Sequence, residues 1–315
     1  MVVENKKGDL MKKFISFLLL ISILGLVYYY QEDIVSYILK EVIYKQEFPE
    51  YQNNSYFKNA NYNYVSLTDN FYPKNETDIR NALYTILNSG MTSYVLYCDD
   101  EYINCLSDVE RIATDYNVLS NINNLVHPYN SYERVYVATN NLGKVDIKVD
   151  KLYSDIEIQE INNTIEAIKN NILSPNMTSR DKIRIFHDYI INNTVYDSER
   201  ADEINNYANT NNRNNSHKAN GVLNNHIALC SGYTDLMAIF LSNIGVPNYK
   251  ISTNNHIWNA VYLDNKWYHL DLTWDDPVTN TGENVLIHDY FLITTEELER
   301  LDKTEHTYDK TVYGF

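Results

Sequence analysis

The sequence predicts an α+β protein with an N-terminal membrane helix, a smaller α/β domain and a larger C-terminal domain. Three observations support this fold class. An apolar run near the N-terminus is preceded by lysines and followed by acidic residues. The next segment alternates between helix-like and strand-like patterns. The C-terminal half contains a helical pattern that starts at a lone cysteine, and two strand patterns joined by a short turn follow it.

The chain is acidic, which excludes one class of partner. Its 315 residues include 42 acidic and 26 basic side chains, which give a formal net charge of −16. Because phosphate binding requires a basic face, we expect no nucleic-acid partner. The apolar fraction of 44% is sufficient for one large core or two ordinary ones.

Residues 14–30, FISFLLLISILGLVYYY, predict a transmembrane signal anchor. A run of this length is near the lower limit for a membrane-spanning helix. Lysines within residues 1–13 predict a cytoplasmic basic tail, and Glu32 and Asp33 follow the anchor, so the remaining chain is expected to be extracytoplasmic at the cell membrane. Cleavage as a secretion signal is the alternative, whereas the flanking charges disfavour a buried core helix.

A tyrosine-rich stalk over residues 31–64 is predicted to lead into an N-terminal α/β domain over residues 65–154. The patterns predict strands at residues 63–69, 93–99, 133–139 and 144–150 and helices at residues 76–90 and 107–126. The second helix is expected to open on a capping box formed by Ser107 and Glu110. This segment contains no group of residues typical of a catalytic site.

The three cysteines are predicted to have two different roles. Cys98 and Cys105 are close in sequence, and a compartment outside the membrane permits a disulfide, so we predict that they form a small staple. Cys230 is then the unpaired cysteine, which is the pattern of a free reactive thiol.

Residues 155–315 are predicted to form the C-terminal domain. Isoleucines spaced by three and four residues predict an apolar helix face between residues 156 and 172, and another helix begins after Thr178. The asparagine-rich run at residues 206–221 has too few apolar residues to build a core and predicts a mobile loop. Its length is compatible with a substrate lid or with plain disorder.

Cys230 precedes a helical pattern that stops at Gly245 and Pro247. The thiol therefore lies in or just before the first turn, where unpaired N–H groups and the helix dipole stabilise a thiolate. The same N–H groups could bind an oxyanion. Ser231 and Gly232 are small enough to let a substrate approach. A nucleophile also needs a base and a group that orients this base.

Two aromatic-rich strand patterns flank residues 264–265 and predict a hairpin with a two-residue turn. Counting back from this turn pairs Trp258 with Asp271 and His256 with Thr273. Because side chains alternate along a strand, these four side chains share one face of the sheet. Asp271 is then the diagonal neighbour of His256 and lies within side-chain reach.

Three motifs in this order resemble the core of the transglutaminase-like superfamily. They are Cys230-Ser231-Gly232-Tyr233 at a helix start, His256-Ile257-Trp258-Asn259 on a strand and Asp271-Leu272-Thr273-Trp274 at a strand end. The resemblance covers roughly residues 178–292. Asn225-His226 departs from the small basic or glycine pair found in many relatives. The resemblance implies a papain-like core, in which a helix bearing Cys packs on an antiparallel sheet bearing His and Asp.

By this resemblance the chemistry is thiol acyl transfer, with Cys230 as nucleophile, His256 as general base and then acid, and Asp271 as the group that fixes the imidazole tautomer. Water as acceptor implies a peptidase or amidase, and a lysine amine implies a crosslinking transglutaminase. The implied substrate is a protein or peptide at the cell surface, and no cofactor is implied. A catalytically silent surface-binding module is the alternative, and a structural surface protein without any site is the third possibility.

The other candidate residues receive simpler interpretations. Trp258 could contact substrate beside His256, while Trp267 and Trp274 are assigned to the core and cleft walls. His187 is assigned to packing against the domain, and His269 is interpreted as a half-buried residue of the sheet.

We predict no metal site. A zinc site can be drawn from Cys230, His226, His256 and His269, but their spacing is not that of zinc ligands. Residues 275–276 are interpreted as loop caps, with calcium ligation as an unsupported alternative.

Overall fold

A computed structural model describes residues 3–31, 33–34, 62, 65, 67, 71–205, 214–278 and 285–313. Most of the predicted stalk lies outside these residues, as does most of the strand predicted at residues 63–69. Within that strand only Val65 and Leu67 are described, and neither lies in a strand.

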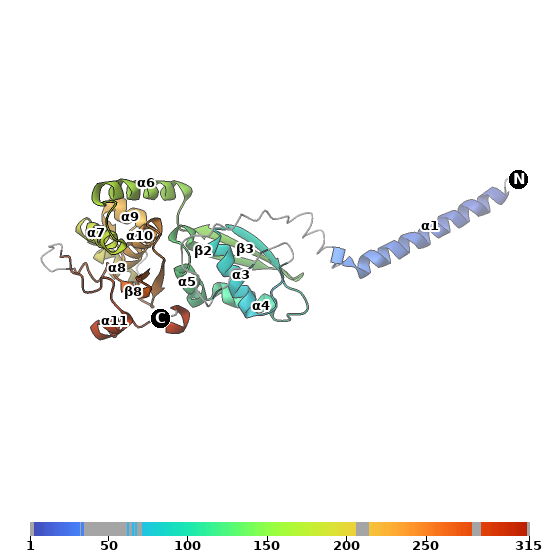
Figure 1. The fold of residues 1–315 in the computed structure, drawn as a ribbon. Coiled ribbons are helices and arrows are strands. Elements are labelled where there is room, and N and C mark those ends of the chain that lie inside the picture. Colours follow the sequence, from blue (N-terminus) through green and yellow to red (C-terminus); the bar gives the residue numbers. More distant parts are fainter. Residues whose placement is uncertain are drawn as a thin grey trace.

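The N-terminal helix α1 (Val3–Tyr29) is longer than the predicted anchor and includes most of the predicted basic tail. Its segment Met11–Tyr29 is long and apolar enough to cross a membrane or to serve as a signal sequence. Its apolar side chains from Met11 onward are exposed, and α1 extends away from the rest of the chain in Figure 1. An apolar helix whose side chains remain uncovered needs an apolar surrounding.

The next elements are α3 (Glu76–Asn88), β1 (Ser93–Tyr97), α4 (Cys105–Thr114), α5 (Tyr116–Asn124), the short 3-10 helix η2 (Pro128–Asn130), β2 (Tyr132–Thr139) and β3 (Lys144–Lys151). The strands form an antiparallel sheet in the order β1-β3-β2. The predicted α/β pattern is therefore corrected to α+β here, because an α/β fold requires parallel strands. The predicted strand pair at residues 133–139 and 144–150 is confirmed.

The helix predicted at residues 107–126 is two helices. Asp115 separates α4 from α5, and its carboxylate accepts hydrogen bonds from the N–H groups of Asn117 and Val118. The helix α4 begins at Cys105, so Ser107 lies inside it and bonds back to the Asn104 carbonyl. The predicted capping box is wrong, because the N-cap of α4 is Asn104 and Ser107 lies within the helix.

The C-terminal half contains α6 (Asp155–Ile172), α7 (Ser179–Asn192), β4 (Val195–Tyr196), α8 (Ser198–Asn205), α9 (Ala219–Asn225), β5 (Ile227–Ala228), α10 (Cys230–Asn243), β6 (Asn248–Ser252), β7 (Ile257–Leu263), β8 (Lys266–Leu270), α11 (Thr295–Leu301) and α12 (Lys310–Tyr313). Ser154 and Thr178 close capping boxes at the starts of α6 and α7. The predicted isoleucine face of α6 is confirmed at its centre, where Ile161, Ile165 and Ile168 are buried.

The hairpin β7–β8 has the predicted register. Asp264 and Asn265 have φ values of 52° and 61°, which is the geometry of a two-residue type I′ turn. Leu263 pairs with Lys266, and the ladder continues to Asn259 opposite Leu270. His256 therefore directly precedes β7 and Asp271 directly follows β8.

The sheet β6-β7-β8 has one core on each side. On one side α10 packs against β6 and β7, and Val261 and Leu270 join a core that also includes α6 and α7. On the other side Tyr249 and Trp258 join a core that is continuous with α3, α4 and α5. Side-chain packing thus continues across the domain boundary predicted at residues 154–155.

The loop predicted at residues 206–221 is partly ordered, and that prediction is corrected for its described part. Residues 206–213 lie outside the described residues. Ser216, Lys218 and Asn220 are buried, and α9 begins at Ala219. The lysine is held by tertiary contacts, since its Nζ lies 2.6 Å from Glu157 Oε1 and over the ring of Tyr153. Composition could not reveal these distant partners.

Candidate active site

Cys230 is the first residue of α10, as predicted. The first hydrogen bond of the helix runs from the Tyr233 N–H to the Leu229 carbonyl, so the preceding N–H groups have no acceptor within the helix. The parallel pair β4–β5 fixes the segment before the cysteine, with Tyr196 opposite Ala228. Cys230 is partly exposed and is a free thiol. Its environment is therefore that of an accessible thiol at the positive end of a helix.

Gly232 allows a close approach between the start of α10 and a distant segment. A Cβ at this position would lie 2.2 Å from the carbonyl oxygen of Ser216. The same carbonyl accepts the Leu229 N–H at 2.8 Å. The glycine thus lets the chain at Ser216 approach the first turn of α10, which holds that turn in place.

His256 and Asp271 form a buried pair. The Nε2 atom of His256 lies 2.5 Å from Oδ2 of Asp271, and the two side chains are 4% and 2% exposed. The other carboxylate oxygen, Oδ1, accepts the N–H groups of Thr273 at 2.9 Å and Trp274 at 3.2 Å. These bonds fix the carboxylate, and through it they fix the plane of the imidazole.

The electrostatics of this pair favour its charged form. Burial alone lowers the pKa of His256, but the charge and hydrogen bond of Asp271, together with a hydrogen bond to Cys230, raise this pKa to about 10. Burial alone raises the pKa of Asp271, whereas the charge of His256 and hydrogen bonds from His256 and His306 hold it well below its ordinary value. His256 is therefore able to accept and hold a proton at neutral pH.

The structure brings Cys230, His256 and Asp271 together. Cys230, at the start of α10, contributes to the raised pKa of His256, which directly precedes β7, and Asp271 at the end of β8 bonds to the same imidazole. All three lie at one end of the sheet β6-β7-β8, where the strand ends and the helix start meet.

Sequence reasoning missed His306 and Asp302. The Nε2 atom of His306 lies 2.8 Å from Oδ2 of Asp271, the atom that also binds His256. Its Nδ1 atom lies 2.7 Å from Oδ2 of Asp302. His306 follows Asp271 by 35 residues, and no periodic pattern connects them. The one available signal was the spacing of Asp302 and His306 by four residues.

Trp258 is completely buried, so the expectation that it contacts substrate is corrected. Its indole N–H donates to Nδ1 of His269 at 3.0 Å, and its ring lies 5.7 Å from that of His256 in a stacked arrangement. Trp258 supports the imidazole from behind. His269, which accepts this hydrogen bond, is 1% exposed and is therefore more deeply buried than the predicted half-buried position.

The four residues considered as zinc ligands, Cys230, His226, His256 and His269, do not form a common site. His226 is exposed, with a φ of 55°, and His269 is engaged by Trp258. Asp275 and Asp276 both serve as hydrogen-bond acceptors. Asp275 accepts the Tyr290 N–H at 2.9 Å and lies 3.1 Å from Nε2 of His187, and Asp276 accepts the hydroxyl of Tyr233.

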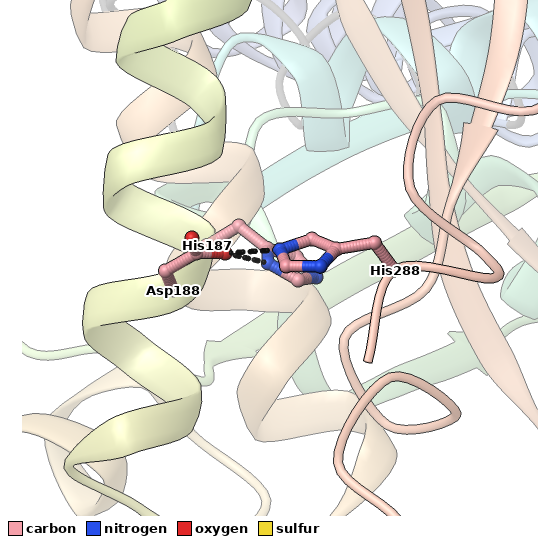
Figure 2. Close-up of side chains that lie close together, drawn as sticks. All are labelled: His187, Asp188 and His288. Carbon is pink, nitrogen blue, oxygen red and sulfur yellow. Dashed lines mark hydrogen bonds and ion pairs between the residues drawn. The ribbon is translucent and has the colours of Figure 1, made fainter. Parts of the chain in front are cut away.

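A second histidine cluster lies away from Cys230. Figure 2 shows His187 and Asp188 on α7 facing His288, and Oδ1 of Asp188 lies 2.9 Å from His187 Nδ1 and 2.7 Å from His288 Nε2. Two ligands of a tetrahedral zinc ion would lie about 3.3 Å apart at bond lengths of about 2.0–2.1 Å. The observed distances are those of hydrogen bonds. This cluster and Asp275 attach α7 to the segment that follows β8.

A cleft of about 610 Å³ is lined by residues that precede His256 and His306 in the sequence, and its lining does not include Cys230, His256 or Asp271. Asn254 and Asn255, which directly precede His256, line one part of it. Thr304 and Glu305, which precede His306, line another. Residues of α5 complete the wall, so the cleft is bounded by both halves of the chain. Its lining is mainly polar.

Comparison with known proteins places this site in a family. Residues 166–272 match the family model of the transglutaminase-like superfamily, and the matched segment includes Cys230, His256 and Asp271. This segment is a transglutaminase-like domain. The family match ends before Asp302 and His306, so these residues lie outside it.

Two solved structures are similar to parts of the chain. One is described as a TGase, with 19% identity, a TM-score of 0.34, and coverage of 56% of this chain and 50% of that chain. The other is described as "a Putative Cysteine Protease from Cytophaga hutchinsonii", with 12% identity, a TM-score of 0.27, and coverage of 49% of this chain and 65% of that chain. No curated protein matches the sequence.

Proposed function

We propose that this protein is a membrane-anchored, extracytoplasmic enzyme that transfers acyl groups through Cys230 and acts on amide bonds of peptides or proteins. The observation that carries the proposal is the buried, hydrogen-bonded pair of His256 and Asp271, together with Cys230 at the start of α10, which interacts with the same imidazole. An isolated thiol at a helix start would support much less, because catalysis also requires an oriented base.

In the proposed reaction the thiol proton moves to His256, and the sulfur attacks the carbonyl carbon of the scissile amide. The C–N bond then breaks, and the imidazolium of His256 donates its proton to the leaving amine. The resulting thioester is attacked by water or by a second amine, whose proton moves to His256. The C–S bond then breaks, which releases the acyl product and restores the Cys230 thiolate beside the protonated His256. Asp271 stabilises the imidazolium in both steps, and the first N–H groups of α10 are available to the developing oxyanion.

The architecture proposed for this function is papain-like, with the cysteine on α10 and the other two residues at the ends of the antiparallel strands β7 and β8. We retain the predicted division into a basic tail (1–13), a transmembrane signal anchor (14–30), a stalk (31–64), an N-terminal domain (65–154) and a catalytic domain (155–315). The apolar segment Met11–Tyr29 supports the membrane location.

Thiol labelling tests the proposal directly. Cys98 and Cys105 are joined in a disulfide, so under non-reducing conditions an alkylating reagent reports on Cys230. We expect the full chain to be labelled rapidly at neutral pH and its Cys230→Ala variant to remain unlabelled. His256→Ala should slow the labelling, whereas His226→Ala, which changes an exposed histidine, should not.

The reaction type is tested by incubating the full chain with a peptide library and a primary-amine probe. Shortened peptides indicate hydrolysis, and probe-modified peptides indicate transamidation. Both products should disappear in Cys230→Ala. Slow labelling at neutral pH together with no product from either reaction would contradict the proposal and favour a catalytically silent binding module.

A further inference from the structure

His306 is buried in the same network as the three proposed catalytic residues, although it lies on a separate segment. Its side chain is 0% exposed, and both of its ring nitrogens face carboxylate oxygens. Nε2 lies 2.8 Å from Asp271 and Nδ1 lies 2.7 Å from Asp302. Its ring stacks on that of Tyr290 at 5.3 Å, so it cannot turn away without disrupting the packing.

Counting donors and acceptors defines how the network can be protonated. A carboxylate oxygen only accepts, so each ring nitrogen that faces one must donate. A neutral imidazole carries one N–H, and it could satisfy only one of the two carboxylates around His306. Both contacts are satisfied when the ring carries two protons.

Asp302 is well suited to hold this extra proton on His306. Its carboxylate also accepts the backbone N–H groups of Thr304 at 2.9 Å, Glu305 at 3.0 Å and His306 at 2.9 Å. Burial alone raises the pKa of Asp302, but hydrogen bonds from Thr304 and His306 hold it well below its ordinary value. An ionised carboxylate with this many donors favours a cationic partner.

The proposed chain of charges alternates in sign through the site. Asp302 and Asp271 are negative, His306 lies between them, and Oδ2 of Asp271 is shared by His306 and His256. A cation at His306 would therefore compete with His256 for the same carboxylate oxygen. The two rings are only 5.1 Å apart.

We infer that His306, held doubly protonated by Asp302, is a positioning residue that fixes the Asp271 carboxylate and limits how tightly this carboxylate holds the proton on His256. The inference rests on the proposed function of Cys230, His256 and Asp271. His306 would aid catalysis because His256, as the general base, must also release its proton to the leaving amine. The positive charge of His306 competes for the Asp271 carboxylate and so makes this release less unfavourable.

Among the residues that the structure describes, the other groups in contact with the two imidazoles do not supply an equivalent cation. His256 faces Cys230 from α10, Asp271 from the end of β8 and the rings of Trp258 and Trp274. His306 faces Tyr290, and Tyr308 and His269 lie behind Trp258. Burial lowers the pKa of His269 to about 3, so this ring is neutral. Glu299, Lys303 and Lys310 line the hollow that Asp302 and His306 also line, and His256 is not part of its lining.

The test variant is His306→Gln, which can still donate an N–H to Asp271 but carries no charge. Removing a positive charge near His256 should move the loss of the His256 proton to higher pH by on the order of one pH unit. The shift can be read from NMR titration of the His256 ring in the full chain and from the pH dependence of Cys230 alkylation. A residue that acted only through packing would not move this titration.

His269→Gln is the matched control, because it replaces an equally buried histidine whose ring nitrogens contact Trp258 and Thr295. Its effect on the His256 titration should be much smaller. A second measurement does not depend on any variant at His306. In the unmodified protein, ring nitrogen NMR at pH 7 should show protons on both nitrogens of His306, and Asp302→Asn should remove one of them.

The outcomes separate the inference from the proposed function. If Cys230 of the unmodified protein is alkylated slowly at neutral pH and neither hydrolysis nor transamidation product forms, the proposed function fails first. If His256 holds its proton to alkaline pH but His306→Gln leaves that titration unchanged, the inference is overturned while the proposed function stands. A singly protonated His306 in the unmodified protein would also overturn the inference, even if His306→Gln did not fold.

Discussion

Replacing Asp271 by Asn gives the strongest test of how the site holds a proton. The change keeps the shape of the side chain and removes its charge. In the unmodified protein the pKa of His256 is raised from 6.5 to about 10, against the effect of burial. This rise corresponds to about 5 kcal/mol in favour of the imidazolium, at about 1.36 kcal/mol per pH unit.

Most of that stabilisation should disappear in Asp271→Asn. Cys230 contributes part of the rise, so we expect transfer of the thiol proton to His256 at pH 7 to become less favourable by on the order of 10²-fold or more. Alkylation of Cys230 should slow accordingly at neutral pH and recover at alkaline pH, where solvent hydroxide removes the thiol proton. The assay is the rate of alkylation across this range, followed by mass spectrometry.

The matched control is Asp264→Asn, which changes an exposed carboxylate in the turn of the same hairpin. It should alkylate like the unmodified protein. The pH dependence of the free energy of unfolding gives an independent check. Because the pKa of His256 is raised in the folded state, the stabilisation that its protonated ring gives the folded protein is fully present below pH 6.5. This stabilisation is lost as the pH rises through about 10. Equal alkylation rates of Asp271→Asn and the unmodified protein at pH 7 would refute the reasoning.

Two further predictions concern the framework of the site. Gly232→Ala should lower the free energy of unfolding by about 1–3 kcal/mol, because its Cβ would lie 2.2 Å from the Ser216 carbonyl oxygen. Chemical denaturation measures this loss, and Ser231→Ala is the control. If the two variants lose the same small amount of stability, the contact with Ser216 does not explain the glycine. Lys250→Ala should cost about 3–5 kcal/mol, because it leaves the buried carboxylate of Asp235 without its cation at 2.8 Å. The double variant Lys250→Met, Asp235→Leu should recover most of that loss, and no recovery would contradict this explanation.

Much of the candidate site follows from local sequence rules. The two-residue turn at Asp264 and Asn265 sets the register of β7 and β8, and the alternation of side chains then puts His256 and Asp271 within reach of each other. The stop signal at Gly245 correctly marked the far end of the helix that Cys230 begins. These features could be predicted because each depends on neighbours in the chain.

Other features of the site depend on contacts between distant segments. His306 and Asp302 enter the network from the segment after α11, and Gly232 is required by the approach of Ser216. The sequence determined the helix that starts at Cys230, the hairpin, the face shared by His256 and Asp271, and an N-terminal apolar segment long enough to span a membrane. Only the tertiary structure decided which additional side chain shares the Asp271 carboxylate, because that depends on how a distant segment folds back over the sheet.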